Sequence, residues 1–142
     1  MIEALETSVL TAWLRQEFIV VIGARVTHIV GLALLIGSSA VWDARLIGFG
    51  ASIPVRDLER IALPIARLGF GLAVVTGAVL FLTNPGELSR NLAFQLKLGM
   101  IVLAVLNSLL YHRFNAASRA HGWASLLLWV SVAVLGRLIG YV

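Results

Sequence analysis

Apolar positions gather in long blocks along the chain, and four stretches contain no formally charged side chain when histidine is counted as neutral. These stretches are residues 26–42, 68–86, 98–112 and 120–136. A transmembrane helix needs about 20 mostly apolar residues, within a range of ~17–25, and flanking Arg or Lys side chains can extend a shorter run by reaching the head groups. The pattern therefore predicts four membrane-spanning helices, at approximately residues 19–47, 62–83, 92–113 and 122–141.

Short connections join the predicted spans. The first span is longer than one crossing requires, so we expect it to tilt or to project beyond the bilayer. Segment 52–54 (SIP) interrupts its continuation, Pro64 suits the opening of the second span, and segment 83–86 (TNPG) predicts a turn before the third. Because no linker is long enough to separate a second domain, the predicted fold class is all-α: residues 1–142 form one integral membrane domain, an up-and-down four-helix bundle.

The segment 1–17 precedes the spans and is predicted to form an amphipathic N-terminal helix. Leu5, Val9 and Trp13 recur near one face, while three acidic residues and Arg15 supply polarity. The segment has no basic region ahead of an apolar run, so it does not match a secretory signal. Two interpretations stay open, namely a helix that lies along the membrane surface and an ordinary helix that caps the bundle.

Composition agrees with a membrane location. Hydrophobic residues make up 60% of the chain, against roughly 45–50% in soluble domains, and charged residues make up only 13%. The net charge of +4 comes from cations scattered singly along the chain, so nucleic acid is not expected as a partner. The chain has no cysteine, which excludes disulfides, thiolate metal sites and iron–sulfur clusters. Any redox chemistry must therefore come from a bound cofactor.

Arginines are more frequent on one side of the predicted membrane. The connections after the first and third spans, together with the start of the second span, hold most of them: Arg45, Arg56, Arg60, Arg67, Arg113 and Arg119. The opposite side has Arg15 and Arg90 in its connecting segments. Since cytoplasmic loops carry the excess of Lys and Arg, both termini are predicted to face the periplasm or the exterior.

Ionisable residues within the spans provide the main candidate for a ligand site. Fifteen residues separate His28 from Asp43, which at 1.5 Å per residue is about 22 Å along the helix. The same counting places Lys97 and Arg137 at nearly the same depth as His28, with Arg25 one turn further out. A cation at the bilayer centre costs about 2.5–3.5 kcal/mol unless it finds a partner or a wet cavity. Together these residues are candidates to bind an anion, a quinone oxygen, a lipid phosphate or haem propionates; alternatively, each cation reaches the outer head groups separately.

Haem is a more specific hypothesis for His28. His112 lies near the opposite membrane boundary, so the two histidines of one protomer cannot share a haem. An axial pair would need His28 with Met100, one turn deeper than Lys97, or His28 from each of two protomers. Haem b and quinone are therefore the cofactors under consideration, and His28 and Met100 are the candidate metal ligands.

Other polar and small residues suggest structural roles. Asp43 is expected to pair with an arginine at its end of the bundle, where Arg45 and Arg113 lie, and Asn107 can hydrogen-bond between helices. No metalloprotease motif, nucleophile elbow, phosphate-binding glycine loop or carboxylate pair occurs. Small residues four apart, at 33/37, 73/77 and 136/140, favour close helix packing within the protomer, with a homodimer face as the lesser alternative.

Four stretches of the chain resemble a family of small uncharacterised bacterial four-span integral membrane proteins. The stretches are THIVGLALLIGSSAVWDARLIGFG, PIARLGFGLAVVTGAVLFLTNP, NLAFQLKLGMIVLAVLNSLLYHR and SLLLWVSVAVLGRLIGYV. The matching elements are His28, Gly31, Asp43, Arg45, Asn91, Phe94, Lys97, Asn107, His112, Trp129, Gly136 and Arg137. The chain is also similar, more distantly, to copper-resistance membrane modules and small b-type cytochromes, although two Met and no Cys offer few soft ligands for copper. The resemblance implies the architecture and a bacterial inner-membrane location, and it implies no reaction.

These observations favour a non-enzymatic membrane protein, either an accessory subunit of a membrane complex or a binder of a small ligand. The alternative is a haem-binding or quinone-reactive electron-transfer protein, and a transporter is a lesser alternative because no span is broken by Gly and Pro at mid-depth. The expected partners are the lipid bilayer and either other membrane subunits or a second copy of the chain.

Overall fold

The computed structural model describes residues 2–114 and 118–141, and in this part of the chain every regular element is an α-helix. Four long helices form the bundle: α3 (Phe18–Ile47), α4 (Val55–Thr83), α6 (Leu92–Phe114) and α7 (Arg119–Leu138). Three short ones are α1 (Ile2–Glu6), α2 (Val9–Gln16) and α5 (Pro85–Arg90). The long helices are long and apolar enough to cross a membrane. The predicted fold class, an all-α four-helix bundle, is confirmed.

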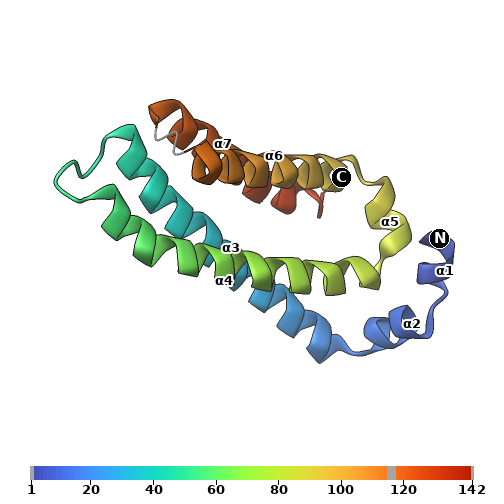
Figure 1. Cartoon of the computed structure of the whole chain (residues 1–142). Helices are drawn as coiled ribbons and strands as arrows, with labels where there is room; N and C mark the ends of the chain where they lie inside the picture. Colours follow the sequence, from blue (N-terminus) through green and yellow to red (C-terminus); the bar gives the residue numbers. More distant parts are fainter. Residues whose placement is uncertain (1, 115–117, 142) are drawn as a thin grey trace.

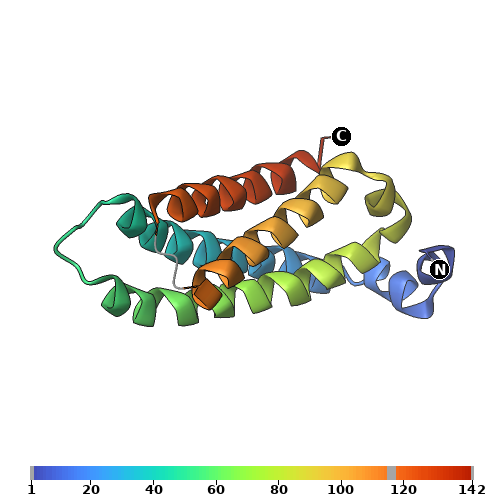
Figure 2. The same cartoon turned by 45° about the horizontal axis from the view of Figure 1, so that its top comes forward.

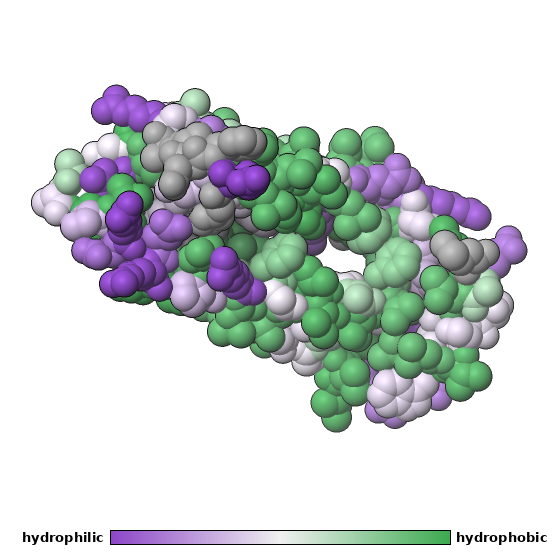
Figure 3. Space-filling view, in the orientation of Figure 1, coloured by the Kyte–Doolittle hydropathy of each residue, from purple (hydrophilic) through white to green (hydrophobic). Residues whose placement is uncertain are grey.

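The bundle consists of two antiparallel pairs, α3 with α4 and α6 with α7 (Figures 1 and 2). The pairs meet mainly where α3 packs along α7, whereas the backbones of α4 and α6 stay apart. The surface is hollowed between the two pairs, and apolar side chains dominate between the hydrophilic ends (Figure 3). The bundle is therefore open along the side between α4 and α6.

Glycines bring α3 and α4 into backbone contact. A Cβ atom on Gly69 would lie 2.5 Å from the Leu35 nitrogen, and one on Gly31 would lie 2.9 Å from the Gly69 oxygen. Glycine is thus required at both positions of this crossing. The predicted small pair at 33/37 does not take part, because a Cβ on Gly37 would meet nothing within 4 Å.

The second span begins earlier than expected. Helix α4 starts at Val55 rather than at residue 62, and Pro64 lies inside it rather than at its opening. The first turns of α4 carry the charged side chains of residues 56–60, which suit water or head groups. The prediction followed the apolar stretch, which marks the membrane, whereas the helix continues beyond it. Pro64 is exposed on the surface of α4.

The N-terminal segment forms two short helices instead of the single predicted helix. Ser8 caps α2 by accepting a hydrogen bond from the Thr11 backbone nitrogen at 3.2 Å, and this turn separates α1 from α2. The buried face also differs from the prediction, because Thr11 and Leu14 are buried while Val9 is 87% exposed. Helix α1 packs on α5, and α2 packs on α3 and α4. The segment therefore caps this end of the bundle.

The two ends of the bundle are distinct. The terminal end holds α1, α2, α5 and both chain termini (Figure 1). The basic end holds the connection 48–54, where Gly48 has φ of 124° and Gly50 has φ of 62°, conformations that favour glycine. Between the ends, a core forms from Leu35, Ala104, Trp129 and Val132, which join α3, α6 and α7.

Candidate functional site

Two cavities lie in the gap between α4 and α6, one toward each end of the bundle. The terminal-end cavity, with a volume of about 400 Å³, contains His28 and Lys97 in its lining. The basic-end cavity, with a volume of about 320 Å³, contains Arg67. Leu35, Phe70 and Trp129 line both cavities and lie at their boundary.

His28 on α3 is oriented by α4. Its Nδ1 lies 3.0 Å from the Thr76 hydroxyl oxygen, and that hydroxyl donates to the Leu72 carbonyl at 2.6 Å. Both contacts are satisfied at once when Nδ1 carries the proton and donates to Thr76, whose own hydrogen goes to Leu72. Gly77 makes room for the ring, since a Cβ there would be 3.2 Å from Cε1. In a neutral ring of this tautomer Nε2 is an acceptor, and the imidazole hydrogen-bonds with Thr76 and with the Ala73 backbone.

Lys97 on α6 enters the same cavity across α7. Its side chain passes over Gly136, where a Cβ would lie 3.2 Å from Nζ and 3.6 Å from Cε. The ammonium group has no hydrogen-bond or ion-pair acceptor among the described residues, and its charge acts on the His28 imidazole. The remaining lining is almost wholly apolar. The cavity thus combines one ammonium, one imidazole acceptor and hydrophobic walls.

An aromatic pair bridges the gap beside this cavity. The rings of Phe81 on α4 and Phe94 on α6 stack with centroids 5.5 Å apart and planes inclined by 13°. Both rings belong to the lining. The pair therefore joins α4 to α6 through side chains where the two backbones do not meet.

The other predicted cations do not join His28 and Lys97. Arg137 is exposed, hydrogen-bonds to the Tyr141 hydroxyl and lies 4.7 Å from the centre of that ring. Arg137 follows Gly136, which faces Lys97, so its side chain is rotated about 100° away. Arg25 is also exposed. Counting residues along the helices correctly placed His28 and Lys97 at one level. Which cations point into the same cavity depends in addition on how each helix is rotated about its axis.

Met100 does not face His28 across the cavity. It packs against the hydrophobic core around Ala104 and Trp129 and is absent from the lining that contains His28. Among the described residues, no group of three or more His, Asp or Glu is placed to hold a metal ion. The histidine–methionine haem pairing within one protomer therefore has no support from the positions of these side chains.

Asp43 corrects another expectation, because it forms no ion pair with an arginine in the described part of the chain. Its side chain is wholly buried between α3 and α7, its oxygens accept no hydrogen bond of ordinary geometry, and the Ser125 hydroxyl is the polar group facing it. Arg45 instead donates to the Ile53 carbonyl at 2.6 Å. Arg113 is exposed. The arginine reaches backbone carbonyls of the 48–54 connection, and the carboxyl group faces α7.

Asn107 links the second helix pair. Its Nδ2 donates to the His121 carbonyl at 3.5 Å, which connects α6 to α7 near the basic end. At the same end, the rings of Trp42 and Tyr111 meet edge to face with centroids 4.5 Å apart, joining α3 to α6.

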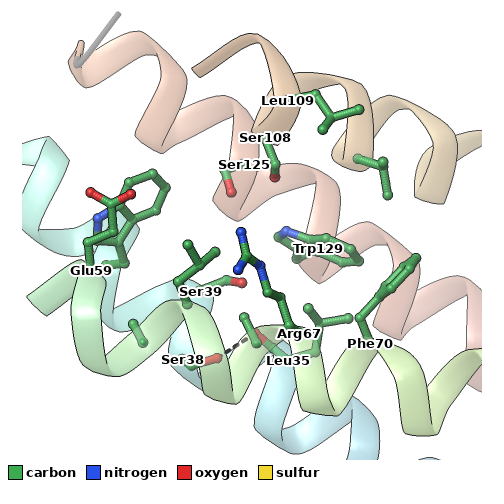
Figure 4. A pocket seen from close by; sticks show the side chains of 15 residues that line it. Leu35, Ser38, Ser39, Glu59, Arg67, Phe70, Ser108, Leu109, Ser125 and Trp129 are labelled. Carbon is green, nitrogen blue, oxygen red and sulfur yellow. Dashed lines mark hydrogen bonds between the residues drawn. The ribbon is translucent and has the colours of Figure 1, made fainter. Parts of the chain in front are cut away.

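Arg67 was missed as a site residue because its sequence position suggested the margin of the second span. Its guanidinium is directed from α4 into the basic-end cavity, near Ser39, Ser125 and Trp129 (Figure 4). A usable signal was present in the sequence, since α3, α6 and α7 each carry a serine at similar depth in an otherwise apolar stretch. Those serines, Ser39, Ser108 and Ser125, line this cavity.

The helices and the two cavities define this protein as a multi-pass, all-helical membrane bundle. The chain matches no protein-family model, no curated protein and no solved structure. The resemblance to a bacterial four-span family stays a prediction from the residues.

Proposed function

We propose that this protein is a non-enzymatic membrane protein that binds a small amphiphilic ligand in the terminal-end cavity, as an accessory subunit or on its own. The ligand has an apolar body and a carboxyl or carbonyl head group. The observation that carries the proposal is the Lys97 ammonium, which enters an apolar cavity opposite His28 without an acceptor among the described residues.

The size and chemistry of the cavity support this proposal. Ligand pockets are mostly apolar, contain a few placed polar groups and have volumes of about 300–1,000 Å³, and this cavity has about 400 Å³. An ammonium inside a bilayer is unfavourable unless it is paired. A ligand oxygen would give Lys97 the acceptor that it lacks. The gap between α4 and α6, which the Phe81–Phe94 pair bridges at one point, offers such a ligand a route from the lipid.

A quinone or quinol is the second candidate, favoured by the tautomer of His28. With Nδ1 donating to Thr76, Nε2 is free to accept a quinol hydroxyl hydrogen. Lys97 would donate to the quinone oxygen. Nε2 is also an atom through which a histidine can ligate haem iron, so haem b with axial ligands from two protomers remains part of this candidate.

Binding of two decyl-chain probes tests the first proposal. Decyl-benzoquinone quenches tryptophan fluorescence on contact, and Trp129 lines the cavity; decanoate serves as the competitor. We expect saturable binding that Lys97→Ala weakens about tenfold, the loss of one charge-assisted hydrogen bond. Arg137→Ala is the matched control, because Arg137 has similar depth and does not line the cavity. Unchanged binding in Lys97→Ala, or no saturable binding of either probe, contradicts the proposal.

The absorption spectrum of the purified protein separates the two candidates. A Soret band that disappears in His28→Ala establishes haem. A quinone extracted from wild-type protein and absent from Lys97→Ala establishes quinone binding. A colourless preparation that binds decanoate more tightly than the quinone favours the first proposal.

A further inference from the structure

Arg67 occupies a position in the basic-end cavity that ion pairing within the protein does not explain. It stands 12 residues after Val55, about 18 Å along α4. Its side chain is directed into the cavity (Figure 4) and makes no hydrogen bond, ion pair or ring contact with a described residue. An arginine within the bilayer needs a partner or a path to the head groups. Arg67 is exposed, so its guanidinium is accessible to a partner from outside the described chain.

We propose that the basic-end cavity binds the phosphodiester group of a membrane phospholipid, with Arg67 as the binding residue. A guanidinium presents N–H donors in a planar fork that matches two phosphate oxygens at once. This site is separate from the proposed ligand site, because it lies in a different cavity and uses neither His28 nor Lys97.

The serines around Arg67 contribute unequally. Ser38 donates to the Leu34 carbonyl at 2.5 Å, and Ser108 donates to the Ala104 carbonyl at 3.0 Å. Their hydroxyl hydrogens are therefore used within their own helices. Ser39 makes no such bond and lies beside the guanidinium in Figure 4. It is the second donor for a phosphate oxygen.

The cavity fits a lipid better than free phosphate. Leu63, Phe70 and Leu109 form apolar walls that suit the glycerol and upper acyl region, and the open side between α4 and α6 admits a lipid from the bilayer. The arginines of the basic end attract anionic lipids to this side of the membrane. Asp43 does not belong to the lining and meets the cavity only through Ser125.

Native mass spectrometry of protein released from mixed micelles tests the proposal. The micelles contain detergent with phosphatidylglycerol, phosphatidylethanolamine or diacylglycerol, and a parallel sample contains inorganic phosphate. We expect wild-type protein to retain one phospholipid, and Arg67→Gln to lower that retention about tenfold. Arg67→Lys keeps the charge without the fork and should give an intermediate loss. Arg60→Gln is the matched control, because Arg60 lies two turns earlier on α4, is exposed as Arg67 is, and does not line the cavity; this variant should retain lipid as the wild type does.

The adduct masses and the folded state separate the outcomes. Equal lipid retention in Arg67→Gln and Arg60→Gln overturns the proposal, because it shows that Arg67 only reaches bulk head groups. Retention of diacylglycerol as strong as that of the phospholipids, or a phosphate adduct in place of a lipid adduct, also overturns it. Circular dichroism of each variant identifies any that has unfolded. If Arg67→Gln unfolds, Ser39→Ala provides a milder test, with a twofold to fivefold loss of phospholipid retention expected.

Discussion

The two cavities share three lining residues and the same open side of the bundle, yet their polar groups are held in different ways. At the terminal end, glycines position the polar side chains: His28 fits beside Gly77, and Lys97 passes over Gly136. At the basic end, Arg67 extends into the cavity with serines around it and makes no hydrogen bond or ion pair with a described residue. The fixed polar groups of the terminal-end cavity suit a ligand whose head group has one defined shape. The Arg67 side chain of the basic-end cavity suits a flexible head group.

The two ends of the bundle also differ in their aromatic contacts and in the segments that cover them. Stacked Phe81 and Phe94 join α4 to α6 at the terminal-end cavity, whereas Trp42 and Tyr111 join α3 to α6 near the basic end. Helices α1, α2 and α5 fold over the terminal end, and the described chain provides only the 48–54 connection over α3 and α4 at the basic end. In the described part of the chain, the terminal end is therefore the one that is covered by helices.

The largest expected effect is a loss of stability when the close contact of α3 with α4, which supports both cavities, is disrupted. In Gly69→Ala the new Cβ would lie 2.5 Å from the Leu35 nitrogen, so α3 and α4 must separate. We expect the free energy of unfolding to fall by about 3 kcal/mol, at the upper end for overpacked cores, because the clash is with backbone. Thermal unfolding in detergent measures it. Gly71→Ala on the same helix is the control, since its Cβ would meet nothing within 4 Å; equal stability of the two variants would contradict the close backbone contact of α3 with α4 at Gly69.

A smaller change in stability, in this case a gain, is expected from a substitution at the basic end. Asp43 is wholly buried and its oxygens lack hydrogen-bond donors of ordinary geometry, so a charge there is not compensated. Asp43→Asn should raise the free energy of unfolding by about 1 kcal/mol. The exposed Asp57→Asn should change it by less than about 0.5 kcal/mol. A destabilised Asp43→Asn would show that the carboxyl group has a partner that the folded chain needs.

Sequence patterns predicted the all-helical membrane class and the common level of His28 and Lys97 along the bundle. Charge-free stretches locate the apolar slab, because a charge in lipid is unfavourable whatever the fold. They did not locate the start of α4 at Val55, since a helix continues wherever its backbone hydrogen bonds are formed. They also did not predict that Thr7 and Ser8 would divide the N-terminal segment, where a serine cap competes with a continuous helix.

For the candidate site, the sequence predicted the level of each residue along the bundle and did not predict the direction of its side chain. Counting residues placed His28, Lys97 and Arg137 at one level, but the direction of each side chain depends on how its helix is rotated by packing. Gly136 facing Lys97 fixes the rotation of α7 and turns Arg137 outward. Arg67 illustrates the converse, since its inward direction depends on the separation of α4 from α6, which no local pattern encodes.

Gly136→Ala sharpens the contrast between the cavities. The added Cβ would lie 3.2 Å from the Lys97 ammonium nitrogen, and the flexible side chain must shift by a few tenths of an ångström. We expect affinity for the decyl-chain probes to fall about threefold to fivefold, which is about 1 kcal/mol or less, with phospholipid retention at Arg67 unchanged. Gly140→Ala is the control, because its Cβ would meet only the Arg137 carbonyl at 3.8 Å. Parallel loss at both cavities would show that they act as one site.

The smallest expected effect concerns the cap over the terminal end. Arg15 donates to the Thr83 carbonyl at 2.9 Å and lies 3.6 Å from Glu6, and both side chains of this ion pair are more than 40% exposed. An exposed ion pair contributes about 0–1 kcal/mol, so Glu6→Gln should leave stability nearly unchanged. Arg15→Ala also removes the bond to α4 and should loosen α2. We expect a twofold to threefold faster release of the decyl-chain probes, measured by stopped-flow fluorescence, and no change in phospholipid retention. Release as slow as in the wild type would mean that the cap does not restrict this cavity, and that the ligand leaves through the open side between α4 and α6.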